Sequence, residues 1–483
     1  MNPLRSSSPA WQVERRGIEP VPGDERHGRV GDVFRLWLAA NLAITSVVIG
    51  AVVMSYGLSL KQSLIALLGV WSFLLVGYFS VAGVRTGRPT MALSAECFGR
   101  VGNVFPAALS WLNLVGWQTV VLVVATYALE AVFQIVFGTQ SGPLTLLSAL
   151  AVVAALAFGV AFLGHTAIVK VQTAFAYLFG GLTLVAAAFL LPDVHWGALL
   201  RTPDGPWLTG LVPAFSIVVA ASGLSWVNMA SDYSRYLPLR TPARPVVLAA
   251  TLGSVVPVLA LMGLGVVLAP SLPGLASAAN PIAELQALLP SWFAVPYLLA
   301  VVGGMVTGDI LDIYSSGLSL IAARVRIPRS RTVLVDAALS LAASVYILLV
   351  AGDAIATFQA FLTLIAGALA PWAAIFLVDA WGWSRRGYPG REALLLGGSG
   401  RAGSATVLPA VRWPAFVAWA AGIVTSLLLT STSVYTGPLA KGVFAGSSLG
   451  FLAGFAVALA LYGGFRVLAG RGVATACKAE GSV

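Results

Sequence analysis

Long apolar stretches, separated by short polar segments, run along most of the chain. Several exceed the roughly 18 apolar residues that are typical of a membrane-spanning helix. No stretch shows the strict alternation of polar and apolar residues that is typical of a membrane-spanning strand. The pattern therefore predicts an all-α integral membrane protein with twelve transmembrane helices. These are expected near residues 34–55, 62–84, 104–136, 143–164, 166–191, 208–230, 245–269, 292–323, 333–350, 354–381, 413–431 and 443–466.

Basic residues are distributed unevenly among the segments that connect these helices. The even-numbered connections carry Arg85, Arg88, Arg100, Lys170, Arg235, Arg240, Arg244, Arg324, Arg326, Arg329, Arg331, Arg385, Arg386, Arg391, Arg401 and Arg412. The odd-numbered connections carry only Lys61, Arg201 and Lys441. Because basic connections stay on the inner side of a membrane, both termini are expected in the cytoplasm and the protein in a plasma (inner) membrane.

Composition supports a membrane protein and excludes several other classes. Hydrophobic residues make up 58% of the chain and charged residues 10%, whereas soluble domains have about 25% charged residues. The net charge of +10 lies on connections and tails, so no nucleic-acid partner is expected. The start of the chain lacks the apolar core of a cleavable signal peptide.

Residue types that carry catalysis or bind metals are sparse. Cys97 and Cys477 lie far apart, so they predict neither a disulfide framework nor a metal cluster. The three histidines, His27, His165 and His195, lie near connections or tails, and no nucleophile–base pair is evident. The chain is therefore not expected to be an enzyme, and no cofactor is expected.

Polar residues interrupt the first and the sixth predicted helices. The first contains "WLAANLAITSVVIG", with Asn41, Thr45 and Ser46, and the sixth contains "LVPAFSIVVAASGLSWVNMASDYSRYLP", with Ser222, Gly223, Trp226 and Asn228. Discontinuous helices expose backbone groups to substrates and ions in many transporters. For any single polar residue a hydrogen bond between helices is the favoured explanation, but the coincidence of polar residues in both helices favours the interruption. Because the two interruptions are five helices apart, an inverted repeat of five plus five helices is expected, with two helices appended.

This division predicts six parts of the chain. They are a cytoplasmic tail (1–33), a first repeat (34–191), a second repeat (192–381), a cytoplasmic linker (382–412), helices eleven and twelve (413–466) and a cytoplasmic tail (467–483).

Trp117 lies inside the third predicted helix, in "LNLVGWQTVVL". This position is too deep for the interfacial belt where membrane tryptophans usually lie. An aromatic face can stack on a flat heterocycle, which contributes roughly 1–3 kcal/mol. Ordinary core packing explains the residue as well, so Trp117 is a candidate stacking residue and no more on these facts.

Two acids, Asp309 and Asp312, lie near the middle of the eighth predicted helix, in "VTGDILDIYSSGL". An aspartate at the bilayer centre costs roughly 2.5–3.5 kcal/mol on insertion scales, and intramembrane acids usually mark ion or substrate sites. The spacing places both on one helical face. A structural ion pair is the alternative, but no lysine, arginine or histidine lies at a matching depth. A functional role is therefore favoured.

Five segments resemble the nucleobase–cation symporter-1 family, and specifically its purine/cytosine permease branch. They are "WLAANL", "GVRTGRPTMALSAECFGRVGNVFP", "VGW", "SWVNMASDYSRYLP" and "DILDIYSSGLSL", in the family's order between residues 37 and 320. The resemblance implies a LeuT-type bundle that imports a flat nitrogen heterocycle together with a cation.

The resemblance also implies roles for individual residues. Trp117 takes the place of the tryptophan that stacks on the ring, and Trp226 could cover the second face. Asp309 and Asp312 occupy positions where relatives have amides. An ionised carboxylate can only accept hydrogen bonds, so a substrate with N–H donors or positive charge is expected. The expected substrate-binding residues are Asn41, Trp117, Gln118, Ser222, Gly223, Trp226, Asp309 and Asp312.

The sodium site of some relatives is incomplete in this chain. The matching positions supply carbonyls from Ala40, Ala43 and Gly304 and the hydroxyl of Thr307, but Gly308 replaces a second hydroxyl. A hard cation prefers a full set of oxygen ligands, so coupling to H⁺ through the two aspartates is expected rather than coupling to Na⁺.

The leading hypothesis is thus a proton-coupled importer of cytosine or a purine. The alternative is a cation symporter for another small heterocycle, such as a hydantoin, allantoin, or a pyridine or pyrimidine vitamin. A substrate-gated receptor without transport is a third possibility. The sequence does not distinguish the individual heterocycle, the stoichiometry or the oligomeric state.

Overall fold

The computed structural model describes residues 13–277, 281–350, 354–389 and 408–480. Within these ranges the secondary structure is helical, apart from an isolated bridge between Ser431 and Thr436. Ten of the described helices are long and apolar enough to cross a membrane, and a bent pair adds an eleventh. A further apolar helix, Trp413–Leu429, is slightly shorter. These segments fall on the twelve predicted positions.

The principal helices have the following bounds. They are α1 Val30–Ala40, α2 Thr45–Ser55, α3 Leu60–Ala66, α4 Phe73–Thr86, α6 Val104–Phe137, α7 Pro143–Leu163, α8 His165–Leu190, α10 Val212–Val219, α11 Ala230–Ser234, α12 Ala243–Leu268, α14 Ala294–Ala322, α15 Arg329–Leu349, α16 Ala354–Arg386, α18 Trp413–Leu429 and α19 Leu449–Glu480.

Some elements differ from the sequence-based expectation. Short helices α5 (Thr90–Phe98), α9 (Trp196–Arg201) and α13 (Pro281–Gln286) lie in connections. Helix α19 continues to Glu480, so the first part of the expected tail from residue 467 is helical. Hydropathy marks where a helix leaves an apolar environment, whereas alanine-rich sequence can keep it helical beyond that point. Residues 390–407 of the predicted linker lie outside the described residues.

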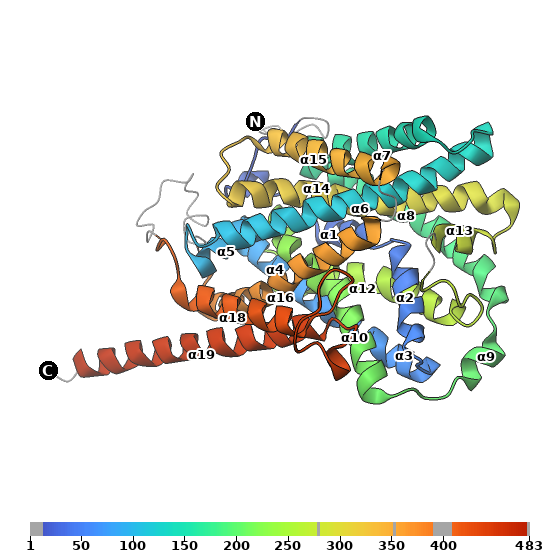
Figure 1. The fold of residues 1–483 in the computed structure, drawn as a ribbon. Helices are drawn as coiled ribbons and strands as arrows, with labels where there is room; N and C mark the ends of the chain where they lie inside the picture. The colour runs from blue at the N-terminus through green and yellow to red at the C-terminus, as the bar shows by residue number, and fades with distance from the viewer. Residues whose placement is uncertain (1–12, 278–280, 351–353, 390–407, 481–483) are drawn as a thin grey trace.

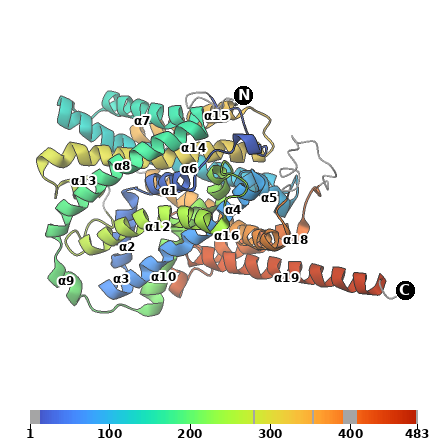
Figure 2. The same cartoon turned by 180° about the vertical axis from the view of Figure 1, so that it is seen from behind.

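The helices form two groups around α14. One side of the molecule contains α6, α7, α14 and α15, which pack against one another in a layer (Figure 1). The turned view shows α8 and α1 lying next to this layer (Figure 2), and both helices contact α14. In the second group α2 and α4 pack against α12, and α11 packs against α4. Helices α18 and α19 lie on the side of the molecule opposite the layer of α6, α7, α14 and α15. Helix α14 is buried along most of its length.

Both predicted helix interruptions are confirmed. Helices α1 and α2 are separated by a break of four residues, 41–44, and are bent by 62°. The sixth spanning segment changes to a π-helical turn at Ala220–Leu224, where Ser222 has non-helical dihedral angles (φ −102°, ψ −122°). At such interruptions backbone carbonyls and N–H groups lose their partners within the helix.

The N-terminal segment, residues 13–29, packs across one end of the helices. Glu14 accepts a hydrogen bond from the backbone N–H of His165, and its own N–H donates to the carbonyl of Leu163. Arg26 donates to the carbonyl oxygens of Val21 and Val84. These bonds attach the segment to helices that are distant in sequence.

Glu14 is the centre of a charged cluster at this end. Arg235 lies 3.6 Å away, and the hydroxyls of Tyr236 and Tyr314 both donate to the Glu14 carboxylate. Burial alone raises the pKa of Glu14, but the charges of Arg329 and Arg235 and the hydrogen bonds outweigh it, so the pKa lies below its usual value. Glu14 is therefore a partly buried acid whose charge is compensated by its neighbours.

Candidate functional site

The break between α1 and α2 lies directly against the middle of α14. The Thr307 hydroxyl lies 2.8 Å from the carbonyl oxygens of both Ala39 and Gly304. A Cβ atom on Gly304 would be 2.2 Å from the carbonyl oxygen of Leu42, so only glycine allows this approach. The structure thus brings the loosened end of α1 and the centre of α14 into contact.

The residues expected to hold a coupling cation lie at this junction. A Cβ atom on Gly304 would lie 3.9 Å from the Cα of Ala43, and one on Gly308 would lie 3.4 Å from the carbonyl oxygen of Ala40. The one side-chain hydroxyl of the set, on Thr307, is engaged with backbone oxygens. Gly308 supplies no side-chain oxygen, so a hard cation would find carbonyls and a single hydroxyl here.

Trp226 follows the break in the sixth segment and lies beside this junction. Its ring would be 3.9 Å from a Cβ atom on Gly308, next to Asp309 in sequence. The Trp37 ring meets it edge-on, with centroids 5.8 Å apart and an interplanar angle of 79°. Trp226 is partly buried, so one part of its surface is not covered by protein.

Ser222 and Gly223 have different surroundings. The Ser222 hydroxyl is buried without a hydrogen-bond partner among the described residues. Gly223 donates its N–H to the Ser72 hydroxyl, and a Cβ atom on it would lie 2.2 Å from the backbone of Ser72. This glycine therefore allows close packing on the start of α4, which explains why an aromatic side chain does not fit there.

The two aspartates of α14 are both buried. Asp309 is fully buried, and neither of its carboxyl oxygens has a hydrogen-bond partner among the described residues. Asp312 is 8% exposed. No salt bridge is found to either acid in the part of the chain that the structure describes. Because an isolated ionised carboxylate in such a place is very costly, Asp309 is expected to be neutral.

Asn41, Trp117 and Gln118 complete the predicted set. Asn41 is buried at the end of α1 and donates to the carbonyl of Trp37. Trp117 is partly buried and packs against a small cluster that includes Leu362 and Ile365. The two neighbours on α6 thus face different helices, since Gln118 is directed to α14.

Gln118 belongs to a hydrogen-bonded chain between α6, α14 and α15. Its amide nitrogen donates to the Ser316 hydroxyl at 3.0 Å, and Ser316 donates to Asp336 at 2.6 Å. The indole N–H of Trp111 donates to the other Asp336 oxygen at 2.8 Å. The amide oxygen of Gln118 is buried without a partner among the described residues.

Sequence reasoning missed three residues of this region. Trp37 packs on Trp226, and its position in "WLAANL" was the available signal. Gln172 of α8 donates to the carbonyl of Thr307. Asp336 of α15 is buried and accepts hydrogen bonds from Trp111 and Ser316, and no local pattern in the sequence indicated these contacts.

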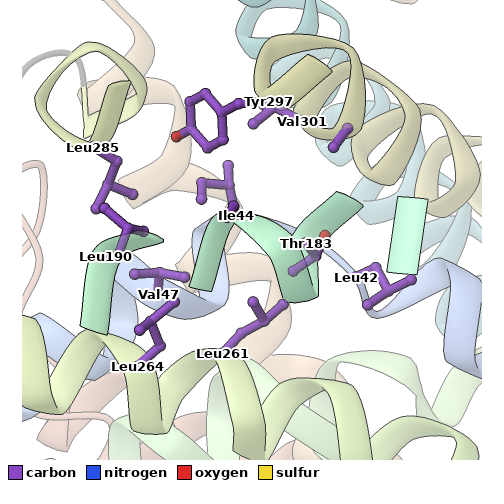
Figure 3. Close-up of a pocket in the computed structure, with 12 residues that line it drawn as sticks. Leu42, Ile44, Val47, Thr183, Leu190, Leu261, Leu264, Leu285, Tyr297 and Val301 are labelled. Carbon is purple, nitrogen blue, oxygen red and sulfur yellow. The ribbon is translucent and has the colours of Figure 1, made fainter. Parts of the chain in front are cut away.

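A separate cavity lies beyond the α1–α2 break. Its wall includes Leu42, Val47, Leu261, Leu264 and Val301, and Figure 3 shows that these side chains surround an apolar space. Tyr297 and Thr183 contribute the only hydroxyl groups among the labelled residues. The wall is otherwise apolar, whereas a polar heterocycle requires several convergent hydrogen-bonding groups, so this cavity is not the candidate substrate site.

Comparisons with known proteins agree with this architecture. Residues 20–454 match the family model described as "Permease for cytosine/purines, uracil, thiamine, allantoin". A putative purine-cytosine permease of Bacillus subtilis is 28% identical over 470 residues, which cover 93% of this chain and 95% of the relative. A purine-cytosine permease of Emericella nidulans is 28% identical over 268 residues, which cover 53% of this chain and 49% of the relative.

Solved structures with the same fold are also found. A nucleobase-cation-symport-1 transporter, Mhp1, in a closed conformation with bromovinylhydantoin bound has a TM-score of 0.70 at 18% identity, covering 93% of this chain and 94% of that one. Its inward-facing conformation has a TM-score of 0.66, covering 95% and 96%. These matches establish a LeuT-type fold for the chain.

Proposed function

The chain belongs to the family of permeases for cytosine/purines, uracil, thiamine and allantoin, and from this premise we propose that it imports a nucleobase such as cytosine or a purine together with protons. The protein is a multi-pass membrane transporter and not an enzyme. The distribution of basic residues supports an inner-membrane orientation with both termini in the cytoplasm.

The observation that carries the proton-coupled mechanism is the state of Asp309. Both of its carboxyl oxygens are buried without partners among the described residues, at the centre of α14, and the preceding residue Gly308 lies against the end of the broken first helix. A group in this environment is stable as a neutral acid and not as a carboxylate. A proton must therefore accompany Asp309 whenever the site is closed to water.

A neutral carboxyl group also suits a nucleobase. It offers one O–H donor and one C=O acceptor, which complements a ring nitrogen next to an amino group, as in cytosine or adenine. An amide at this position would offer the same pattern permanently. An acid offers it only when protonated, so that the proton and the base are bound together.

The remaining residues support this arrangement. Trp117 and Trp226 offer partly uncovered aromatic surfaces, on which a flat ring can stack. The junction of Thr307, Ala39 and Gly304 holds the broken first helix against α14. Opening this junction on the inner side would expose Asp309 to the cytoplasm, where both base and proton would be released.

Uptake by purified protein in liposomes tests the proposal. With an inward proton gradient we expect accumulation of radiolabelled cytosine or adenine, and we expect a sodium gradient of equal size to add nothing. The proposal fails if none of cytosine, adenine and hypoxanthine is accumulated, or if a sodium gradient alone drives uptake.

A symporter of another small nitrogen heterocycle is the second candidate function. It is favoured by Asp309 and Asp312, which stand where relatives have amides. Competition by allantoin, a hydantoin and pyridoxine in the same uptake assay distinguishes the two candidates, because the true substrate class competes at the lowest concentration.

A further inference from the structure

The hydrogen-bonded chain behind Gln118 has a fixed direction. The Trp111 indole can only donate, so one Asp336 oxygen must accept from it. The 2.6 Å distance between Ser316 and the other oxygen is typical of a hydroxyl that donates to an ionised carboxylate. The Ser316 hydroxyl also lies 2.9 Å from the carbonyl of Ile313, which is the weaker acceptor.

The direction of this chain determines how Gln118 is oriented. Since the single proton of Ser316 is directed to Asp336, the Ser316 oxygen can only accept from Gln118. The amide of Gln118 must then place its nitrogen toward Ser316. Its oxygen remains as a buried acceptor without a partner among the described residues, and an unpaired buried acceptor is destabilising unless a ligand satisfies it.

The amide oxygen of Gln118 lies near the part of α14 that carries Asp309 and Asp312. Ser316 lies one helical turn beyond Asp312 on α14, and Trp117 precedes Gln118 on α6. An amide that is bonded to Ser316 is therefore held close to the part of α14 that carries the proposed site. Asp336 itself is fully buried on α15 and is separated from Gln118 by Ser316.

We propose that Asp336 is a positioning residue, which acts through Ser316 to hold the Gln118 amide with its oxygen available to a substrate N–H, and thereby determines the hydrogen-bonding pattern that the site selects. This inference rests on the proposed function. It assigns a specificity role to a residue of α15 that contacts neither the substrate nor the coupling proton.

Selectivity between bases with opposite hydrogen-bonding patterns tests the inference. Cytosine and uracil present opposite donor and acceptor patterns on the same ring edge, and adenine and hypoxanthine form a second such pair. The ratio of inhibition constants is measured for each pair in proteoliposome uptake. In Asp336→Asn the Ser316 proton is no longer held by a carboxylate, so that the Gln118 amide can take either orientation. For the pair of bases that the protein binds, we expect the ratio of inhibition constants to move toward unity by about tenfold.

A second variant and a matched control make the test independent of folding effects. Ser316→Ala disconnects Gln118 from Asp336 and should shift the ratio as Asp336→Asn does, with no further shift in the double variant. Ser344→Ala is the control, since Ser344 also lies on α15 but contacts the backbone of Thr119 at 3.5 Å, and it should leave the ratio unchanged. If Asp336→Asn does not fold, Ser316→Ala against Ser344→Ala decides the question alone.

The possible results are distinguishable. A ratio unchanged in Asp336→Asn or Ser316→Ala, or shifted equally in Ser344→Ala, overturns the inference and leaves the proposed function intact. If the wild-type protein binds none of the four bases, the proposed function itself fails and the inference fails with it.

Discussion

The surroundings of two acids, the partly buried Glu14 and the fully buried Asp309, differ sharply. Glu14 lies at the end of the bundle, where two arginines and two tyrosine hydroxyls surround its carboxylate. Asp309 lies at the middle of α14, where neither carboxyl oxygen has a partner among the described residues. The Glu14 side chain is 15% exposed and Asp309 is fully buried, yet only Glu14 is compensated by neighbouring charges and hydrogen bonds.

The difference indicates which acid is structural. A buried carboxylate within a satisfied network holds helices in place, and removal of one partner leaves the others uncompensated. An unpaired buried acid contributes nothing of this kind to stability, so that its retention in a spanning helix is explained by exchange of a proton or by contact with a ligand. The contrast predicts large losses of stability for variants of the Glu14 cluster and small ones for Asp309.

Glu14→Gln should have the largest effect on stability. It leaves the buried Arg235 and Arg329 without the counter-charge of Glu14, and we expect a loss of about 3 kcal/mol in the free energy of unfolding. Thermal unfolding of the purified protein in detergent measures this loss. Glu25→Gln is the control, because Glu25 pairs with Arg16 at the surface and should change stability by less than about 0.5 kcal/mol.

The Glu14 cluster should also depend on pH. Because the pKa of Glu14 is lowered in the folded state, its contribution is fully present above the unfolded pKa of about 4.3 and is lost as the pH falls through the folded pKa. The stability difference between wild type and Glu14→Gln should therefore shrink in acid. A difference that grew in acid would contradict the assignment.

Trp117→Ala should weaken substrate binding by about 2 kcal/mol, since it removes one aromatic face from the ring. The measurement is the concentration of unlabelled cytosine or adenine that halves uptake. Trp292→Ala provides the control, because Trp292 is 68% exposed. If both variants bind equally well, Trp117 is a packing residue.

Thr307→Ala should have a smaller effect of about 1 kcal/mol. It removes the neutral hydrogen bond that joins α14 to the end of α1, and thermal unfolding should register it as a small loss. Thr126→Ala removes only a bond within α6 and serves as the control. A loss as large as that of Glu14→Gln would contradict the view that charge compensation is concentrated at the end of the bundle.

Asp309→Asn should have the smallest effect on stability, within about 0.5 kcal/mol of wild type. It replaces an unpaired neutral acid by an amide of similar size and breaks no described bond. A marked loss of stability would show that Asp309 has a structural partner.

The sequence predicted the membrane fold and the two broken helices, because hydropathy and clusters of polar residues are local signals. It also located the unpaired acid, since no basic residue lies at its depth. It did not predict that Trp37 covers an edge of Trp226, or that Asp336 reaches Gln118 through Ser316. Those contacts depend on how the helices that carry these residues are rotated about their axes, and a single sequence does not specify this.

The most direct test of the proton-coupled site is simultaneous measurement of base uptake and proton flux in liposomes. Wild-type protein should accumulate cytosine or adenine against its gradient and carry protons inward with it. Asp309→Asn keeps a donor and an acceptor at the site but cannot exchange a proton, so it should allow downhill uptake without proton flux or accumulation. Proton-driven accumulation by Asp309→Asn at the wild-type level would contradict the assignment of Asp309 as the coupling acid.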